Sequence, residues 1–164
     1  MTLFQAVLLS AAFLCSLVAG LLFAFAAVVM PGIKRLDNGD FIRSFQVMDR
    51  VIQNNQPLFV VVWVGSVLAL LTAAVLGLWE LSGANRLLLA ITALIYLIGV
   101  QLPTITINIP LNNALQKLDV GRMDDTTRKR ARDVFEPRWN RWNVIRAVGA
   151  SLTSVLLVLL LLRV

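Results

Sequence analysis

A set of uncharged amides, one hydroxyl and one arginine lies where the apolar segments of this chain end. The set consists of Asn54, Gln101, Thr104, Asn108, Asn112, Asn143 and Arg146. Polar groups at the edge of hydrocarbon are costly unless they find partners, so such a cluster is a functional-site hypothesis. An arginine beside amides can hold an anionic or phenolate oxygen while the amides orient a carbonyl. This is electrostatic stabilisation, and the set offers no obvious nucleophile or general base.

The residue types that are missing exclude most other chemistry. The chain has no histidine and one cysteine, Cys15, which lies inside the first apolar segment. A lone buried cysteine is usually an apolar packing residue and makes no internal disulfide. Without imidazole, and without carboxylates inside the apolar segments, the usual haem, copper, zinc and di-iron sites are not available. We therefore expect no metal ion and no tightly bound cofactor.

The composition indicates an integral membrane protein. Of all residues, 59% are hydrophobic and 15% are charged, whereas soluble domains carry about 25% charged residues. The formal net charge of +6 could suggest nucleic acid. However, the basic residues lie between long apolar runs, without the aromatic-lined basic groove of single-strand binders. We therefore expect no nucleic-acid partner, and a basic surface that faces the headgroups of the lipid bilayer.

Four apolar segments predict an all-α fold, an integral membrane four-transmembrane-helix bundle in a single domain over residues 1–164. The spans are expected at about 3–30, 57–79, 87–107 and 139–162, and each covers the ~20 residues that cross a bilayer. The first segment has no Lys or Arg at its start and is longer than the apolar core of a signal peptide. We therefore expect it to remain as a helix.

The distribution of lysine and arginine predicts the orientation in the membrane. The first loop contains Lys34, Arg35, Arg43 and Arg50, and the third loop with its exit contains Lys117, Arg122, Arg128, Lys129, Arg130, Arg132, Arg138 and Arg141. Only Arg86 and Arg163 fall on the opposite side. Because basic residues are retained on the cytoplasmic side, we expect both termini outside and loops one and three in the cytoplasm, in the plasma (inner) membrane.

Each cytoplasmic loop is expected to carry an amphipathic helix. Apolar residues recur at helical spacing in the first loop, at Phe41, Phe45, Met48 and Ile52. This pattern favours a helix that lies along the interface. In the third loop, Asp124 or Thr126 can cap a basic helix that ends before Pro137.

Small residues repeat every four positions in two spans. They are Ala12, Ser16, Gly20 and Ala24 in the first span and Gly65, Ala69, Ala73 and Gly77 in the second. Such repeats let helix backbones approach closely in lipid. They could join helices within one chain or build a homo-oligomer, and the sequence leaves both open.

Helical geometry brings the polar set together. At 100° per residue, the four polar residues of the third span share one face, and Asn143 shares a face of the fourth span with Arg146. The expected topology places these faces and Asn54 near one membrane surface. Taken singly, the amides could instead satisfy backbone groups freed by Pro103 and Pro110, where we expect a kink. Arg146 could likewise extend to the interface.

Aromatic side chains are expected to flank the polar set. They are Phe23, Phe25, Trp63, Trp139 and Trp142. A wall of this kind suits a small, flat, lipophilic aromatic ligand that partitions from the bilayer.

Three segments of the chain resemble a known family. They are Gly20-Leu-Leu-Phe23 running to Pro31, Asn108-Ile-Pro110-Leu-Asn112 followed by Leu115, and Trp139 through Asn143 to Arg146. In this order, and at these helix ends, they are similar to the anthrone oxygenase family over nearly the whole chain. Fungal members are linked to the oxidation of polyketide anthrones to anthraquinones with molecular oxygen, without a metal or flavin.

The resemblance implies a membrane-embedded, cofactor-independent oxygenase that acts with O2 on a lipophilic phenolic or anthrone-type substrate. Arg146 would stabilise the substrate anion, and Asn143 and Asn108 would orient its oxygens as further catalytic residues. The substrate-binding residues would be Asn112, Gln101, Thr104, Asn54, Phe23 and Trp139, with no metal ligand.

Two other functions remain open. The chain could be a non-catalytic membrane protein whose amides only pack helices, or it could bind or transport a small lipophilic ligand in the same pocket. A proton-coupled exporter usually needs an intramembrane carboxylate, and the nearest one, Glu80, is expected at the outer turn. Transport is therefore the weaker alternative.

Overall fold

The computed structural model describes residues 1 to 164, and every regular element in it is helical. The α-helices are α1 (Leu3–Ala24), α2 (Met30–Ile33), α3 (Asn38–Gln53), α4 (Pro57–Glu80), α5 (Gly83–Tyr96), α6 (Ile109–Gln116) and α7 (Asp125–Leu161). The other elements are three π-helical segments, Phe25–Val29, Leu97–Gln101 and Thr104–Asn108, and one 3-10 turn, Val120–Arg122.

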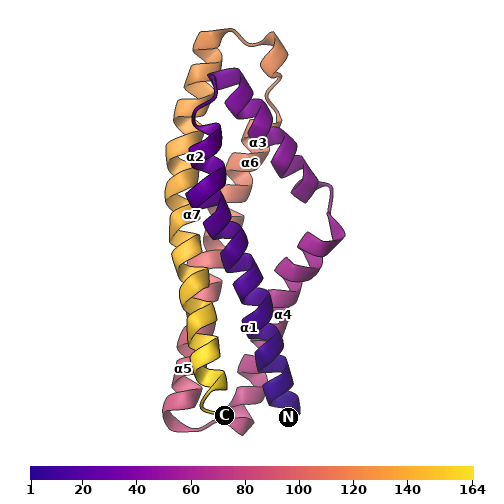
Figure 1. The fold of residues 1–164 in the computed structure, drawn as a ribbon, viewed down its shortest axis with the longest axis vertical. Coiled ribbons are helices and arrows are strands. Elements are labelled where there is room, and N and C mark those ends of the chain that lie inside the picture. The colour runs from indigo at the N-terminus through magenta and orange to yellow at the C-terminus, as the bar shows by residue number, and fades with distance from the viewer.

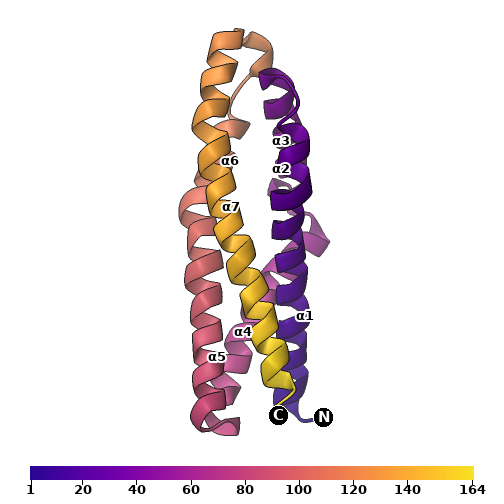
Figure 2. The ribbon, with the colours of Figure 1, turned by 60° about the vertical axis from the view of Figure 1, so that its left-hand side comes forward.

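Four helical runs are long and apolar enough to cross a membrane. They are Leu3–Ile33, Pro57–Glu80, Gly83–Gln116 and Asp125–Leu161. They confirm the predicted all-α integral membrane bundle. Both termini and the turn between α4 and α5 lie at one end of the molecule, which we call the terminal end (Figure 1). The helix α3 and the connection between α6 and α7 lie at the opposite end, the α3 end (Figure 2).

Of the two helices expected in loops one and three, the structure contains the first as a separate helix but not the second. In the first loop, α3 is a separate helix, and the Asp37 side chain caps it by accepting from the backbone N–H of Asp40 at 2.8 Å. In the third loop, no separate helix ends before Pro137, because α7 runs through this proline and into the fourth span. Proline inside a helix costs roughly 3 kcal/mol, since it removes one backbone donor. Phe135 and Trp139 pack in a hydrophobic core on either side of it, which favours the continuous helix.

Each π-helical segment ends two residues before a proline. The segments Phe25–Val29, Leu97–Gln101 and Thr104–Asn108 precede Pro31, Pro103 and Pro110. In each case the residue directly before the proline donates its backbone N–H to the carbonyl five residues back, as Ile109 does to Thr104. The kinks expected at Pro103 and Pro110 therefore take the form of widened turns. Such turns occur frequently at functional sites.

Two hydrophobic cores lie along the bundle. The larger one is built by α1, α4, α5 and α7 and includes Leu8, Leu70 and Leu157, which are fully buried. The smaller one lies at the α3 end and consists of Met30, Phe41, Ile42, Phe45, Leu115, Val120, Phe135 and Trp139. Both halves of the bundle therefore have a packed core, while α4 diverges from the bundle toward its connection with α3 (Figure 1).

Glycine permits the close approach of α7 to the third span. A Cβ atom on Gly149 would lie 3.3 Å from the Val100 side chain and 3.6 Å from the backbone of Gly99. Small residues of the second span also pack within the chain, because a Cβ on Gly65 would lie 3.3 Å from Leu14. Gly20 of the first span is exposed, and a Cβ there would meet no atom within 4 Å.

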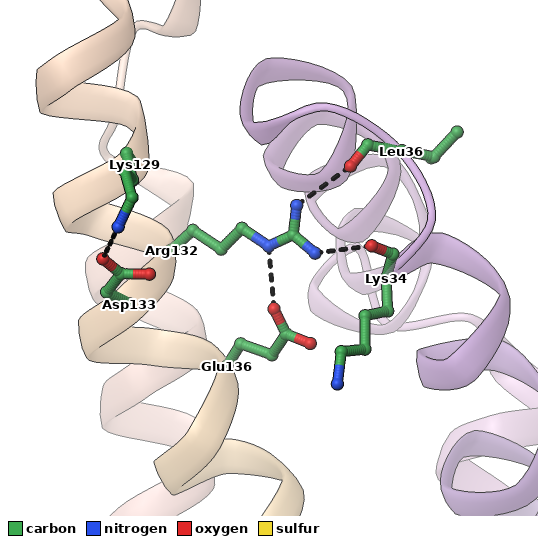
Figure 3. Close-up of polar contacts among 6 residues, drawn as sticks. All are labelled: Lys34, Leu36, Lys129, Arg132, Asp133 and Glu136. Atoms are coloured by element: carbon green, nitrogen blue, oxygen red, sulfur yellow. Dashed lines mark hydrogen bonds and ion pairs between the residues drawn. The ribbon is translucent and has the colours of Figure 1, made fainter.

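A partly buried arginine of α7, ion-paired on its own helix, ties α7 to the segment that leads into α3 (Figure 3). The Arg132 guanidinium donates to Glu136 at 2.7 Å and to the backbone carbonyls of Lys34 at 2.7 Å and Leu36 at 2.9 Å. It also lies 4.3 Å from the centroid of the Phe41 ring. These contacts hold α3 against α7, and α3 contributes to the site described next.

Candidate functional site

A cavity of about 190 Å³ lies inside the bundle, between the two hydrophobic cores. Its wall consists of Leu21, Leu22, Phe25, Phe45, Asp49, Ile52, Phe59, Trp63, Thr104, Asn108, Ile109, Asn112, Trp139, Asn143 and Arg146. Two of the π-helical segments contribute to it, through Phe25 and through Thr104 and Asn108. The widened turns therefore shape the wall of the cavity.

Six of the nine predicted site residues line this cavity: Arg146, Asn143, Asn108, Asn112, Thr104 and Trp139. Gln101 lies behind the wall, where its side-chain oxygen accepts from the indole N–H of Trp63 at 3.1 Å. The two others lie elsewhere. Asn54 is an exposed residue at the C-terminal cap of α3. Phe23 is 62% exposed on the outside of α1 and does not line the cavity, whereas Phe25, which was also expected in the aromatic wall, does.

Arg146 is the centre of the polar wall. The residue is 5% exposed, and its guanidinium donates from Nη1 to the Thr104 hydroxyl at 3.1 Å and from Nη2 to Asn143 Oδ1 at 3.0 Å. Its buried Nε–H has no hydrogen-bond partner. Arg146 takes part in no ion pair. Buried charges are normally paired, because removing them from water is costly, so this guanidinium is suited to an anionic group that enters the cavity.

Two asparagines beside Arg146 have different surroundings. Asn143 is fixed at both ends, since its Nδ2 donates to the carbonyl of Leu22 at 3.0 Å and its Oδ1 accepts from Arg146. Asn108 is 2% exposed and makes one long contact, from Nδ2 to the carbonyl of Trp139 at 3.5 Å. Its buried Oδ1 has no partner. The wall therefore contains one unpartnered donor, on Arg146, and one unpartnered acceptor, on Asn108.

A chain of hydrogen bonds leads from Trp139 to a carboxylate. The indole N–H of Trp139 donates to Asn112 Oδ1 at 2.8 Å, and Asn112 Nδ2 donates to Asp49 Oδ1 at 2.7 Å. Because the indole can only donate, it fixes which end of the Asn112 amide faces Asp49. The other carboxylate oxygen of Asp49 accepts from Gln53 at 2.6 Å and from Gln116 at 2.9 Å.

Asp49 is the wall residue that the sequence analysis missed. The expected spans contain no carboxylate, and Asp49 lies in the loop between two of them, so it was not counted among intramembrane groups. In the structure α3 packs against α6 and α7, which buries Asp49 to 4% exposure. The sequence contains a signal for this burial, because Asp49 follows Phe45 by four residues and Phe41 by eight. Helical periodicity therefore places it beside the apolar face of α3.

The sequence comparison decides the family. A family model described as anthrone oxygenase matches residues 46–156, which is more than half of the chain. The chain belongs to the anthrone oxygenase family. The match includes every polar residue of the cavity wall, and the wall residues outside it are the apolar Leu21, Leu22, Phe25 and Phe45. No curated protein and no solved structure matches this chain.

The donor set of this anthrone oxygenase family member defines what its cavity can do. No group of three or more His, Cys, Asp and Glu side chains is placed to hold a metal ion. The cavity instead combines one guanidinium, one hydroxyl, three amides and one carboxylate with the aromatic side chains of Phe25, Phe59, Trp63 and Trp139. Such a set can bind a flat apolar molecule, orient its oxygens and stabilise negative charge on one of them.

Proposed function

We propose that this protein is a membrane-embedded oxygenase that acts with O2 on a lipophilic phenolic or anthrone-type substrate, without a tightly bound cofactor. Family membership supports the reaction class. The observation that carries the proposal is the buried guanidinium of Arg146, which lies on the cavity wall with no carboxylate partner and an unpartnered Nε–H. An anionic substrate oxygen would supply the missing charge.

The reaction needs negative charge to be stabilised. An anthrone loses a proton from its ring methylene to give an electron-rich anion with its charge on the conjugated oxygen. In the overall change, CH2 and O2 become C=O and H2O, so one oxygen atom enters the product and the other leaves as water. The Arg146 guanidinium would hold the anionic oxygen, and removing one such donor typically lowers kcat by about 100-fold to 1,000-fold.

The two unpartnered wall atoms match a hydroxylated aromatic substrate. Arg146 Nε offers a donor and Asn108 Oδ1 offers an acceptor. A phenolic hydroxyl next to an anionic or carbonyl oxygen would satisfy both at once. Amides that served only to pack helices would be expected to satisfy each other, so these two atoms favour a ligand site over a packing role.

The size of the cavity indicates how such a substrate would enter. About 190 Å³ is less than the roughly 300–1,000 Å³ of typical ligand pockets. An apolar surface groove of about 360 Å³ adjoins it and shares the wall residues Leu21, Phe25, Ile52 and Phe59. Phe59 and Ile52 come from α4 and α3, and the other two from the first span. A flat substrate from the bilayer would pass between these helices and extend across both spaces.

The membrane placement is part of the same proposal. Loops one and three, with their excess of Lys and Arg, would face the cytoplasm, and both termini would lie outside, in the plasma (inner) membrane. The cavity would then lie near the cytoplasmic surface. The alternative function is a non-catalytic protein that binds a small lipophilic ligand in this cavity, and it is supported by the same unpartnered wall atoms.

The test is oxygen consumption by purified protein supplied with an anthrone such as emodin anthrone. The wild type should accelerate it, and Arg146→Met should lose at least about 100-fold in kcat/KM. Arg146→Lys should retain part of the rate, because it keeps the charge without the planar donor fork. Arg141→Met is the matched control, since Arg141 is exposed on the same helix.

Three outcomes separate the possibilities. Loss of rate in Arg146→Met with a normal Arg141→Met supports the oxygenase. A wild type that accelerates no tested phenolic substrate, yet shows a raised melting temperature with ligand, supports the binding protein. Equal rates in the wild type and Arg146→Met would overturn the role of Arg146.

A further inference from the structure

Building on the proposed function, we propose that Asp49 is the general base of the reaction, and that it removes the proton from the reactive methylene of the substrate. The family match assigns no role to any residue. The four expected spans contain no histidine and no carboxylate, so a side-chain base would have to come from elsewhere in the chain. The structure brings one carboxylate to the cavity wall, and it is Asp49.

The position of Asp49 on the cavity wall supports its role as a base. Asp49 lines the same cavity as Arg146, although the two residues are 97 positions apart and belong to α3 and α7. Asp49 is 4% exposed, so its carboxylate faces protein and cavity and not bulk solvent. A substrate whose oxygen reaches Arg146 therefore lies in the space that Asp49 also borders.

The hydrogen bonds of the Asp49 carboxylate leave room for a proton. A carboxylate has about four acceptor positions, two on each oxygen. Oδ2 of Asp49 accepts from Gln53 and Gln116, so both of its positions are used. Oδ1 accepts from Asn112 only. One acceptor position on Oδ1 therefore remains, on a residue that borders the cavity, and it is available to take a proton.

The groups that surround the Asp49 carboxylate also support its role as a base. From α3 and α6, the groups that contact the carboxylate are the neutral amides of Gln53, Asn112 and Gln116. From α7, the charged group on the cavity wall is Arg146. Asp49 forms no ion pair, so no cation occupies its lone pairs. The amides hold the carboxylate in one orientation and leave it able to accept a proton.

The proposed step balances atoms and electrons. Asp49 takes H⁺ as the C–H bond breaks, and the electron pair moves into the aromatic system and onto the oxygen held by Arg146. O2 then adds to the carbanionic carbon, and the proton returns from Asp49 to the terminal peroxide oxygen to give a hydroperoxide. Loss of water from this hydroperoxide leaves the carbonyl. O2 is the oxidant, and Asp49 ends the cycle as the carboxylate it was at the start.

The test is the pH profile of oxygen consumption with emodin anthrone in the full-length protein. At neutral pH, Asp49→Asn should lose at least about 100-fold in kcat/KM, since general bases contribute about 100-fold to 10,000-fold. The acidic limb of the profile should also disappear. The rate of Asp49→Asn should then rise with pH, because at high pH the substrate ionises on its own and needs no base. Asp133→Asn is the matched control, since Asp133 is exposed on α7 and paired with Lys129.

The pH profile separates a base from a structural residue. A structural role would lower the rate by the same factor at every pH, and that result would overturn the proposal. If Asp49→Asn does not fold, Asp49→Glu decides, because it should keep the acidic limb at a rate at least about 10-fold lower. Loss of the acidic limb in Asp49→Glu, which keeps a carboxylate, would overturn it. The proposed function fails separately, if the wild type itself shows no acceleration.

Discussion

The two halves of this bundle satisfy their buried polar groups to different degrees. Toward the terminal end they are paired: the Ser66 and Tyr96 hydroxyls lie 2.6 Å apart, and the Thr153 hydroxyl donates to the carbonyl of Gly149 at 2.9 Å. At the α3 end, and in the adjoining part of the third span, four buried side-chain atoms have no partner. They are Gln101 Nε2, Asn108 Oδ1, Asn140 Oδ1 and Arg146 Nε.

The backbone follows the same division. Two of the three π-helical segments, Phe25–Val29 and Thr104–Asn108, contribute residues to the cavity wall. The helices α4 and α5 reach the terminal end without such turns. Unsatisfied buried polar atoms cost free energy, and a packing role does not explain them. This difference indicates that the half of the bundle near the termini is organised for stability, whereas the half that holds the cavity is organised for a ligand.

The largest effect is expected at Asn143, in the ligand half. Asn143→Ala removes the bonds to the Leu22 carbonyl and to Arg146 Nη2. Because misplacement of a reacting group by about 1 Å can cost about 100-fold in rate, we expect a loss of that size in kcat/KM. Steady-state oxygen consumption measures it. Thr153→Val, on the same helix, should leave the rate unchanged, and a comparable loss there would remove the distinction between the halves.

A large effect on stability is expected at Arg132, which anchors α3. Arg132→Ala removes charge-assisted bonds to Glu136 and to two backbone carbonyls, and such bonds contribute about 1.5–3 kcal/mol each. Lys129→Ala removes an exposed pair with Asp133 and should cost less than about 1 kcal/mol. Thermal unfolding in detergent compares the two variants. Equal melting temperatures would mean that the Arg132 contacts do not anchor α3.

A smaller effect is expected at Ser66, in the stability half. Ser66→Ala leaves the buried Tyr96 hydroxyl without this partner. Hydrogen bonds between transmembrane helices contribute about 0.6 kcal/mol on average and about 1.7 kcal/mol at most. The melting temperature should fall slightly while kcat/KM stays at the wild-type value. A strong loss of turnover in this variant would extend the functional region into the terminal half.

The smallest effect is expected at the solvent-exposed start of α7. Hydrogen bonds from the Thr127 side chain and backbone hold the pKa of the Asp124 carboxyl below its usual value. Asp124, the N-terminal cap of α7, therefore adds stability at pH values above the usual aspartate range. This contribution disappears as pH falls through the lowered pKa of its carboxyl. Thermal unfolding as a function of pH should show this dependence in the wild type and not in Asp124→Ala. Turnover at neutral pH should not change.

Much of the bundle and part of the site could be predicted from the sequence. Hydropathy located the four spans, because ~20 apolar residues are required to cross a bilayer. Helical periodicity gathered Thr104, Asn108 and Asn112 with Asn143 and Arg146, and the structure places these five in one cavity. Both predictions depend on local spacing along a helix, which the sequence records directly.

The remainder depends on tertiary packing. The sequence predicts both Phe23 and Phe25 in the cavity wall, and only Phe25 lies there, because the first span is apolar on every side and its periodicity does not show which face is inward. The continuity of α7 through Pro137 depends on Phe135 and Trp139 packing into a core with α3. Asp49 reaches the cavity only because α3 lies against α6 and α7. None of these contacts can be read from neighbouring residues in the sequence.

The central claim is that the polar cluster around Arg146 is a ligand site and not a means of packing helices. The most direct measurement is the melting temperature of Arg146→Met with and without a hydroxylated anthraquinone, compared with the wild type. Replacing a buried charge that has no ionic partner by an apolar side chain of similar length removes the cost of keeping that charge out of water. We therefore predict an unchanged or higher melting temperature without ligand, and loss of the increase that ligand gives the wild type. A large drop without ligand, together with a retained ligand shift, would contradict the account.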